Sequence, residues 1–113
     1  MIVVKYPSHV ALQDDIANYT RKAMDEISKY SRNPTKENAI KTIRKAMEVM
    51  NTFEGYGGRI ACSDLIREEL REMHNNISRG DGYNTQEYLA SVIQFCEYLC
   101  RAIANGKPRK KVL

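Results

Sequence analysis

Hydrophobic residues recur along this chain at steps of three and four positions, which places them on one face of an α-helix. The first run follows Pro7 and Ser8, a pair typical of a helix start with Ser8 as the N-cap. Its apolar positions are Leu12, Ile16, Tyr19, Ala23, Ile27 and Tyr30. The spacing predicts a first helix over residues 9–31.

A second run begins after Asn33 and Pro34, because proline fits the first turn of a helix without losing a hydrogen bond. Either Asn33 or Thr35 can cap it, and the pattern does not choose between them. The apolar face consists of Ile40, Ile43, Met47 and Met50. The pattern predicts a helix over residues 34–52, ended by the glycine-rich segment 53–58.

The third run has a narrow apolar stripe between charged positions. Leu65, Ile66, Leu70, Met73 and Ile77 form this stripe, and it predicts a helix over residues 60–78. The segment 80–82 contains two glycines and ends it.

The fourth run is apolar over most of its circumference. Asn84 and Glu87 have the spacing of a capping box, and the helix is predicted over residues 85–104. The apolar positions are Tyr88, Leu89, Val92, Ile93, Phe95, Cys96, Leu99, Cys100 and Ile103. Such a helix must be covered on several sides, so we expect it to be the central helix of a bundle or part of a subunit interface.

Four amphipathic helices with short connections favour an all-α, single-domain antiparallel bundle. The length of 113 residues fits one domain. We expect the bundle to span residues 1–106 and a mobile basic tail to span 107–113. Residues 2–5 have the composition of a short extended segment, for which we expect no partner strand.

Cysteine and histidine spacing gives no sign of a metal site or another cofactor. Cys62, Cys96 and Cys100 form no C-x-x-C pair, and His9 and His74 stand at no ligand spacing. We expect Cys96 and Cys100 to be small buried hydrophobic residues. The N-terminal segment is too short and too polar for a signal peptide, and no apolar run is long enough for a membrane span. A cytoplasmic protein is therefore expected.

One acidic segment has the form of an enzymatic motif. Glu68, Glu69 and Glu72 give the pattern E-E-x-x-E, in which Glu68 and Glu72 lie one helical turn apart. The pattern resembles the first half of the magnesium-binding motif of all-α nucleotide pyrophosphohydrolases related to MazG. That family also requires E-x-x-D on the following helix, and this chain has none there. Metal-dependent nucleotide hydrolysis is therefore the weakest functional alternative.

Charge is unevenly distributed along a chain whose net charge is +4. Residues 29–47 hold six cations against one acid, residues 101–113 hold five cations and no acid, and residues 48–100 hold four cations against nine acids. We expect the first helix corner and the tail to meet in one basic pole that attracts an anionic partner. The residues of this predicted pole are Lys29, Arg32, Lys36, Lys41, Arg44, Lys45, Lys107, Arg109, Lys110 and Lys111.

These observations predict a non-enzymatic protein of adaptor, chaperone or inhibitor type that acts by protein–protein interaction. Methionines along the helix faces can adapt their packing to a partner: Met24, Met47, Met50 and Met73. Self-association through the fourth helix is a further expectation. The main alternative is a nucleic-acid-binding accessory protein that uses the basic pole, which would contact phosphates.

Overall fold

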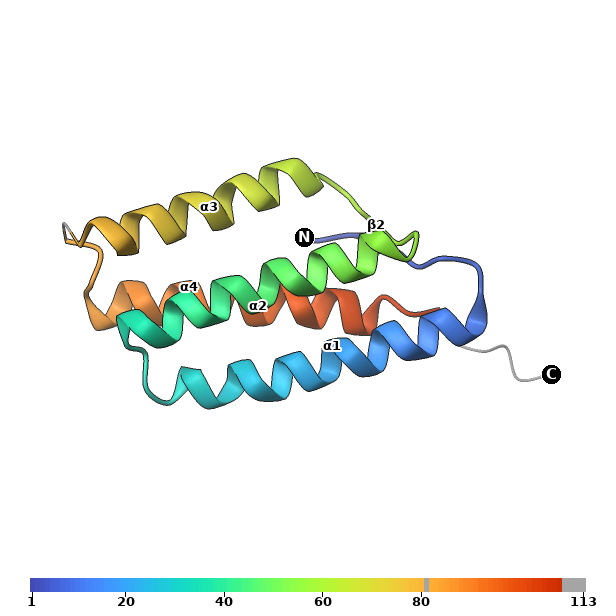
Figure 1. Ribbon diagram of the computed structural model, residues 1–113, viewed down its shortest axis with the longest axis horizontal. Coiled ribbons are helices and arrows are strands. Elements are labelled where there is room, and N and C mark those ends of the chain that lie inside the picture. Colours follow the sequence, from blue (N-terminus) through green and yellow to red (C-terminus); the bar gives the residue numbers. More distant parts are fainter. Residues whose placement is uncertain (81, 109–113) are drawn as a thin grey trace.

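The chain folds into four helices that run alternately in opposite directions along one long axis (Figure 1). The computed structural model describes residues 1–80 and 82–108. The helices are α1 (Val10–Ser31), α2 (Lys36–Gly55), α3 (Ser63–Arg79) and α4 (Gln86–Asn105). The predicted all-α antiparallel bundle is confirmed, and each helix begins and ends within three residues of its predicted limits.

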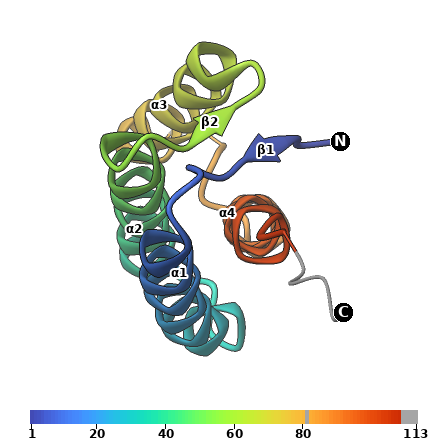
Figure 2. The same cartoon turned by 90° about the vertical axis from the view of Figure 1, so that its right-hand side faces the viewer.

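The four helices are not packed equally. α1, α2 and α3 form a curved row, and α4 lies on its concave side against α1 and α2 (Figure 2). Within the described chain, α3 packs on α2 and has at most marginal contact with α1 and α4. The wide apolar arc of α4 packs against α1 and α2 and buries eight residues, more than any other helix, while α2 is the helix that packs on all three others.

Buried side chains from α1, α2 and α4 form most of the core. The largest wholly buried side chains include Ile27 of α1, Phe53 of α2 and Leu99 of α4. α3 contributes Leu70 and Ile77. Its Leu65, which the stripe assigned to the apolar face, is 66% exposed, because α2 covers only one side of this helix.

Side-chain caps begin three of the helices, at positions that differ in part from those predicted. Thr35 caps α2 and Thr85 caps α4, each accepting the amide hydrogen three residues ahead. His9 caps α1 in place of Ser8 through its Nδ1 atom. Asn84, the predicted cap of α4, instead donates to the carbonyl oxygen of Gly80.

A two-residue strand near the N-terminus has a partner, so the prediction of an unpaired extended segment was wrong. β1 (Val4–Lys5) pairs antiparallel with β2 (Arg59–Ile60), which lies in the α2–α3 connection. Gly57, at a φ of 93°, makes the turn that brings β2 into position. The third helix therefore begins at Ser63, beyond the strand.

The segment after β1 is fixed to the core by Tyr6. Its hydroxyl donates a hydrogen bond of 2.6 Å to the carbonyl oxygen of Ile103, and its ring packs edge-on against Phe53 at 5.0 Å. Burial raises the pKa of Tyr6 to about 12. At the same end, Gly106 leaves room for the side chain of Val4, which a β-carbon at that position would overlap.

Candidate functional site

The basic residues of the first corner lie at one end of the molecule. Lys29 and Arg32 at the end of α1 and Lys36 at the start of α2 are exposed there (Figure 1). Lys41 and Arg44 follow along α2. Lys41 forms an ion pair of 3.2 Å with Glu37 on its own helix, so part of its charge is neutralised locally.

Lys45 of α2 forms ion pairs at the contact between α1 and α2. Its Nζ atom lies 3.4 Å from carboxylate oxygens of both Glu26 and Glu48. Burial acts to lower the pKa of Lys45, but the hydrogen bonds and charges of these two carboxylates outweigh it and raise the pKa. Lys45 therefore links two helices and is a weak candidate for binding an external anion.

The structure does not place Lys107 in the predicted basic pole. Lys107, which follows α4, forms an ion pair with Asp14 near the start of α1, at the opposite end of that helix from Lys29. The fourth helix of an up-down bundle ends away from the first corner, as Figure 1 shows. The structure therefore separates Lys107 from the corner cluster. Arg109, Lys110 and Lys111 lie outside the described residues.

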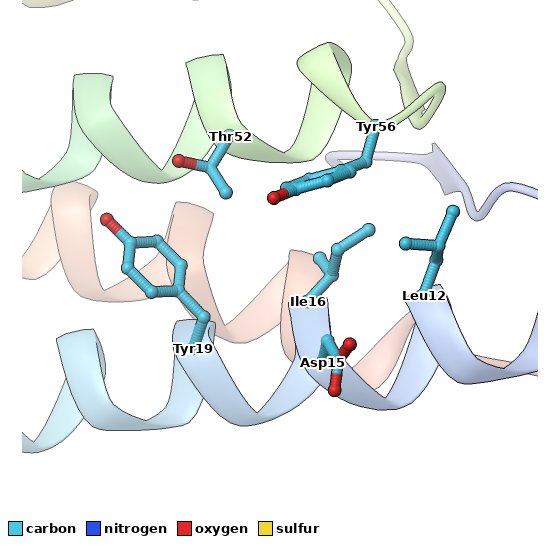
Figure 3. A pocket seen from close by; sticks show the side chains of 6 residues that line it. All are labelled: Leu12, Asp15, Ile16, Tyr19, Thr52 and Tyr56. Carbon is cyan, nitrogen blue, oxygen red and sulfur yellow. The ribbon is translucent and has the colours of Figure 1, made fainter.

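A half-open pocket of about 280 Å³ lies between the start of α1 and the end of α2 (Figure 3). Its lining residues are Leu12, Asp15, Ile16, Tyr19, Thr52 and Tyr56. Ile16 is buried, whereas Tyr56 is 54% exposed and lies along the mouth. We call this the α1–α2 pocket. It combines mostly apolar walls with hydroxyl groups.

The polar groups of the α1–α2 pocket differ in how firmly they are held. The hydroxyl of Tyr19 donates a 2.8 Å hydrogen bond to Glu48. Burial and this hydrogen bond raise the pKa of Tyr19, while the same bond lowers the pKa of Glu48. Asp15 is exposed and has no ion pair or hydrogen bond to another described residue. The pocket thus presents one carboxylate, unpaired within residues 1–80 and 82–108, beside an apolar surface.

A second pocket of about 280 Å³ lies between α2 and α3, and we call it the α2–α3 pocket. Ile43 and Met47 supply its apolar part, and no carboxylate lines it. Its polar lining residues are Arg44, Arg71, His74 and Asn75. His74, which stands at no metal-ligand spacing in the sequence, is half-buried between the two helices.

The acidic segment of α3 forms a surface of mixed charge. Glu68 and Glu72 line one shallow depression together with Arg71 and Arg79. Within residues 1–80 and 82–108, no three His, Cys, Asp or Glu side chains gather as metal ligands. The alternating signs are those of a solvated helix face.

The cysteines of α4 are buried, as predicted. Burial raises the pKa of the Cys100 thiol to about 12 and that of Cys96 further. Both therefore stay protonated and unreactive at neutral pH. Cys62, which precedes α3, is exposed.

Neither pocket could be predicted from the sequence. Tyr19 has the spacing of a core residue, and Tyr56 belongs to the glycine-rich segment. Arg71 and His74 appear as members of a charged helix face. Their meeting depends on how α2 pairs with its neighbours, which apolar periodicity does not specify.

Comparisons with known proteins give this chain no relative: no protein family, no curated protein and no solved structure matches it. In the described part of the chain, none of the helices has the length and apolar character needed to cross a membrane.

Proposed function

We propose that this protein is a non-enzymatic interaction module that binds a partner protein through the α1–α2 pocket. The observation that supports this most is the pocket itself, a half-open and largely apolar hollow carried by two well-packed helices. Its volume suits one large side chain and is small for an organic cofactor. Aromatic and aliphatic anchors that fill such hollows dominate the binding energy of many protein interfaces.

The charge at the mouth indicates which partner segment would fit. Asp15 is the charged residue in the pocket lining, and it has no partner among the described residues. A lysine or arginine next to the apolar anchor would pair with it. Tyr19 and Tyr56 add rigid aromatic surface of the kind that is enriched in interfaces. We therefore expect an anchor of leucine, methionine or phenylalanine with a nearby cation.

Binding of nucleic acid has less support. Among the described residues it relies on Lys29, Arg32, Lys36 and Arg44, because Lys41 and Lys45 are ion-paired and Lys107 lies at the other end of the molecule. A cluster of four exposed cations gives weak, salt-sensitive contact with phosphates. Binding of duplex DNA or RNA that disappears when these four residues are replaced by glutamate would favour this second function.

Selection of peptides on the immobilised full chain tests the proposal without a known partner. A phage-displayed library of random peptides should yield sequences that place a large apolar residue within four positions of lysine or arginine. Tyr56→Ala should weaken the selected peptides about tenfold, since it removes one wall of the pocket. Asp15→Asn should weaken them by about threefold, the size of an exposed charge pair.

Tyr98→Ala provides the matched control, because Tyr98 is a similarly exposed tyrosine, 47% against 54%, on α4. It should leave binding unchanged. Equal losses for Tyr98→Ala and Tyr56→Ala, or selected peptides whose anchors are flanked by acids, would contradict the proposal. A selection that yields no specific peptide would also count against it.

A further inference from the structure

The α2–α3 pocket concentrates nitrogen donors in a hollow that no carboxylate lines. Arg44 comes from α2 and Arg71 from α3, so two guanidinium groups approach one space from opposite helices. His74 lies one helical turn beyond Arg71, on the same face of α3. Ile43 and Met47 lie beside these donors and provide an apolar surface.

The two arginines differ from their neighbour Arg67, one turn earlier on α3. Arg67 forms an ion pair of 2.6 Å with Glu54 and donates to Asn51 and Ser63. Neither Arg44 nor Arg71 has an ion pair or hydrogen bond with any described residue. Their donors are therefore available to an external anion.

We propose that the α2–α3 pocket binds a phosphate monoester carried on an apolar or aromatic group. Arginine presents several N–H groups in a plane, which matches the oxygens of a phosphate. His74 and Asn75 can add further donors. The apolar wall of Ile43 and Met47 would contact the organic part, so an ester should bind more tightly than inorganic phosphate. This site is separate from the α1–α2 pocket and does not depend on the function proposed for it.

Acids in an adjoining depression limit the strength of the site. Glu68 and Glu72 do not line the pocket, but both line the adjoining depression, in which Arg71 also takes part. They reduce the positive potential that Arg71 contributes. Replacing Glu68 by glutamine should therefore strengthen the binding of the anion.

Titration of the full chain, labelled with ¹⁵N, by phenyl phosphate tests the site directly. Amide signals of residues 43–47 and 71–75 should shift, with a Kd in the millimolar range or tighter. Inorganic phosphate should give the same pattern of shifts with weaker affinity. Arg44→Gln and Arg71→Gln should each lower the affinity for phenyl phosphate about tenfold, the usual effect of losing a charge-assisted hydrogen bond.

A short uncharged peptide that contains phosphotyrosine distinguishes the two sources of such a ligand. Tighter binding than phenyl phosphate would assign the site to a phosphorylated partner chain, and equal or weaker binding would assign it to a free organic phosphate. Either result supports a phosphate monoester site.

Arg32→Gln is the control, because Arg32 is an exposed cation at the α1–α2 corner, outside this pocket. It should leave the affinity unchanged. An equal loss in Arg32→Gln, which would indicate attraction to the general positive charge, overturns the proposal. The absence of shifts at residues 43–47 and 71–75 with both phenyl phosphate and the peptide overturns it too.

Discussion

α3 and α4 follow each other in the chain and have similar lengths, 17 and 20 residues, but they occupy very different positions. α4 buries eight residues and packs on both α1 and α2, whereas α3 buries two and packs on α2. Both helices are amphipathic. The comparison shows that the width of the apolar arc, more than its presence, determines where a helix sits in the bundle.

The ends and contacts of α3 also differ from those of α4. Thr85 caps α4, whereas Cys62 precedes α3 in the left-handed conformation and supplies no side-chain cap. Arg67 joins α3 to α2 through an ion pair with Glu54 and a hydrogen bond to Asn51. α3 is therefore held by a few polar and apolar contacts, and we expect it to detach from α2 more easily than the rest of the bundle unfolds.

Removal of a core side chain from α4 should have the largest effect on stability. Leu99 is wholly buried, and Leu99→Ala should lower the free energy of unfolding by about 2–5 kcal/mol. Denaturation in urea, followed by circular dichroism, measures this loss. Leu65→Ala on α3 is the control and should change stability by less than about 0.5 kcal/mol, since Leu65 is exposed.

Alkaline pH should destabilise the protein through groups on or against α4. Burial raises the pKa values of Cys96, Cys100 and Tyr6, so the unfolded chain loses these protons at lower pH than the folded chain does. Their contribution to stability is complete below about pH 9 and declines as pH rises toward 12. Each thiol should cost about 1.4 kcal/mol per pH unit in this range.

Urea denaturation at a series of pH values from 8 to about 11 follows this decline. The double variant Cys96→Ala/Cys100→Ala should be less stable at neutral pH but should lose less stability on going to alkaline pH. If stability declined equally with pH in the variant and the wild type, the two thiols would not be the cause of the decline.

Removal of the ion pair and hydrogen bonds of Arg67 should have a smaller effect on stability, and this effect should be confined to α3. Arg67→Met leaves the carboxylate of Glu54 without its cation and should cost about 1–3 kcal/mol in the docking of α3. Hydrogen exchange should increase in α3 and change little in α4. Arg71→Met is the matched control, because Arg71 forms no bond with a described residue, and it should leave exchange unchanged.

Replacement of Cys62, the left-handed residue before α3, by glycine should give the smallest change in stability. Cys62 has a φ of 58°, a conformation that costs a non-glycine residue about 1 kcal/mol. Cys62→Gly removes this cost but adds freedom to the unfolded chain, so a net gain of about 0.5 kcal/mol is expected from the difference. Thermal denaturation measures it. Ala61→Gly, at the preceding exposed residue, should destabilise instead.

The sequence was sufficient to predict the helices and the extensive burial of α4, because periodicity and the width of an apolar arc are local properties. The pairing of β1 with β2 was missed, since strands of two residues leave no pattern. The exposure of Leu65 was not predicted, because an apolar stripe does not indicate how many other helices pack against it. The expectation that Lys107 lies at the first corner was wrong, because the fourth helix of an up-down bundle ends at the opposite end of the molecule.

The two pockets could not be predicted for a different reason. Tyr56 and Asp15, or Arg44 and Arg71, lie on different helices, and each pair meets only once the helices have been placed side by side. A single sequence contains no signal for that placement beyond the order of the elements. The positions of charged residues along the sequence did show that charge is unevenly distributed, but they did not show which cations form ion pairs in the fold.

Native-state hydrogen exchange, resolved by residue, is the most direct test of the contrast between α3 and α4. Amides in the middle of α3, around Leu70, should exchange through a local opening of lower free energy than that of α4 around Leu99, which should require global unfolding. Increasing urea should leave the opening of α3 almost unaffected until global unfolding takes over. Equal opening free energies for the two helices, with the same urea dependence, would contradict the peripheral position assigned to α3.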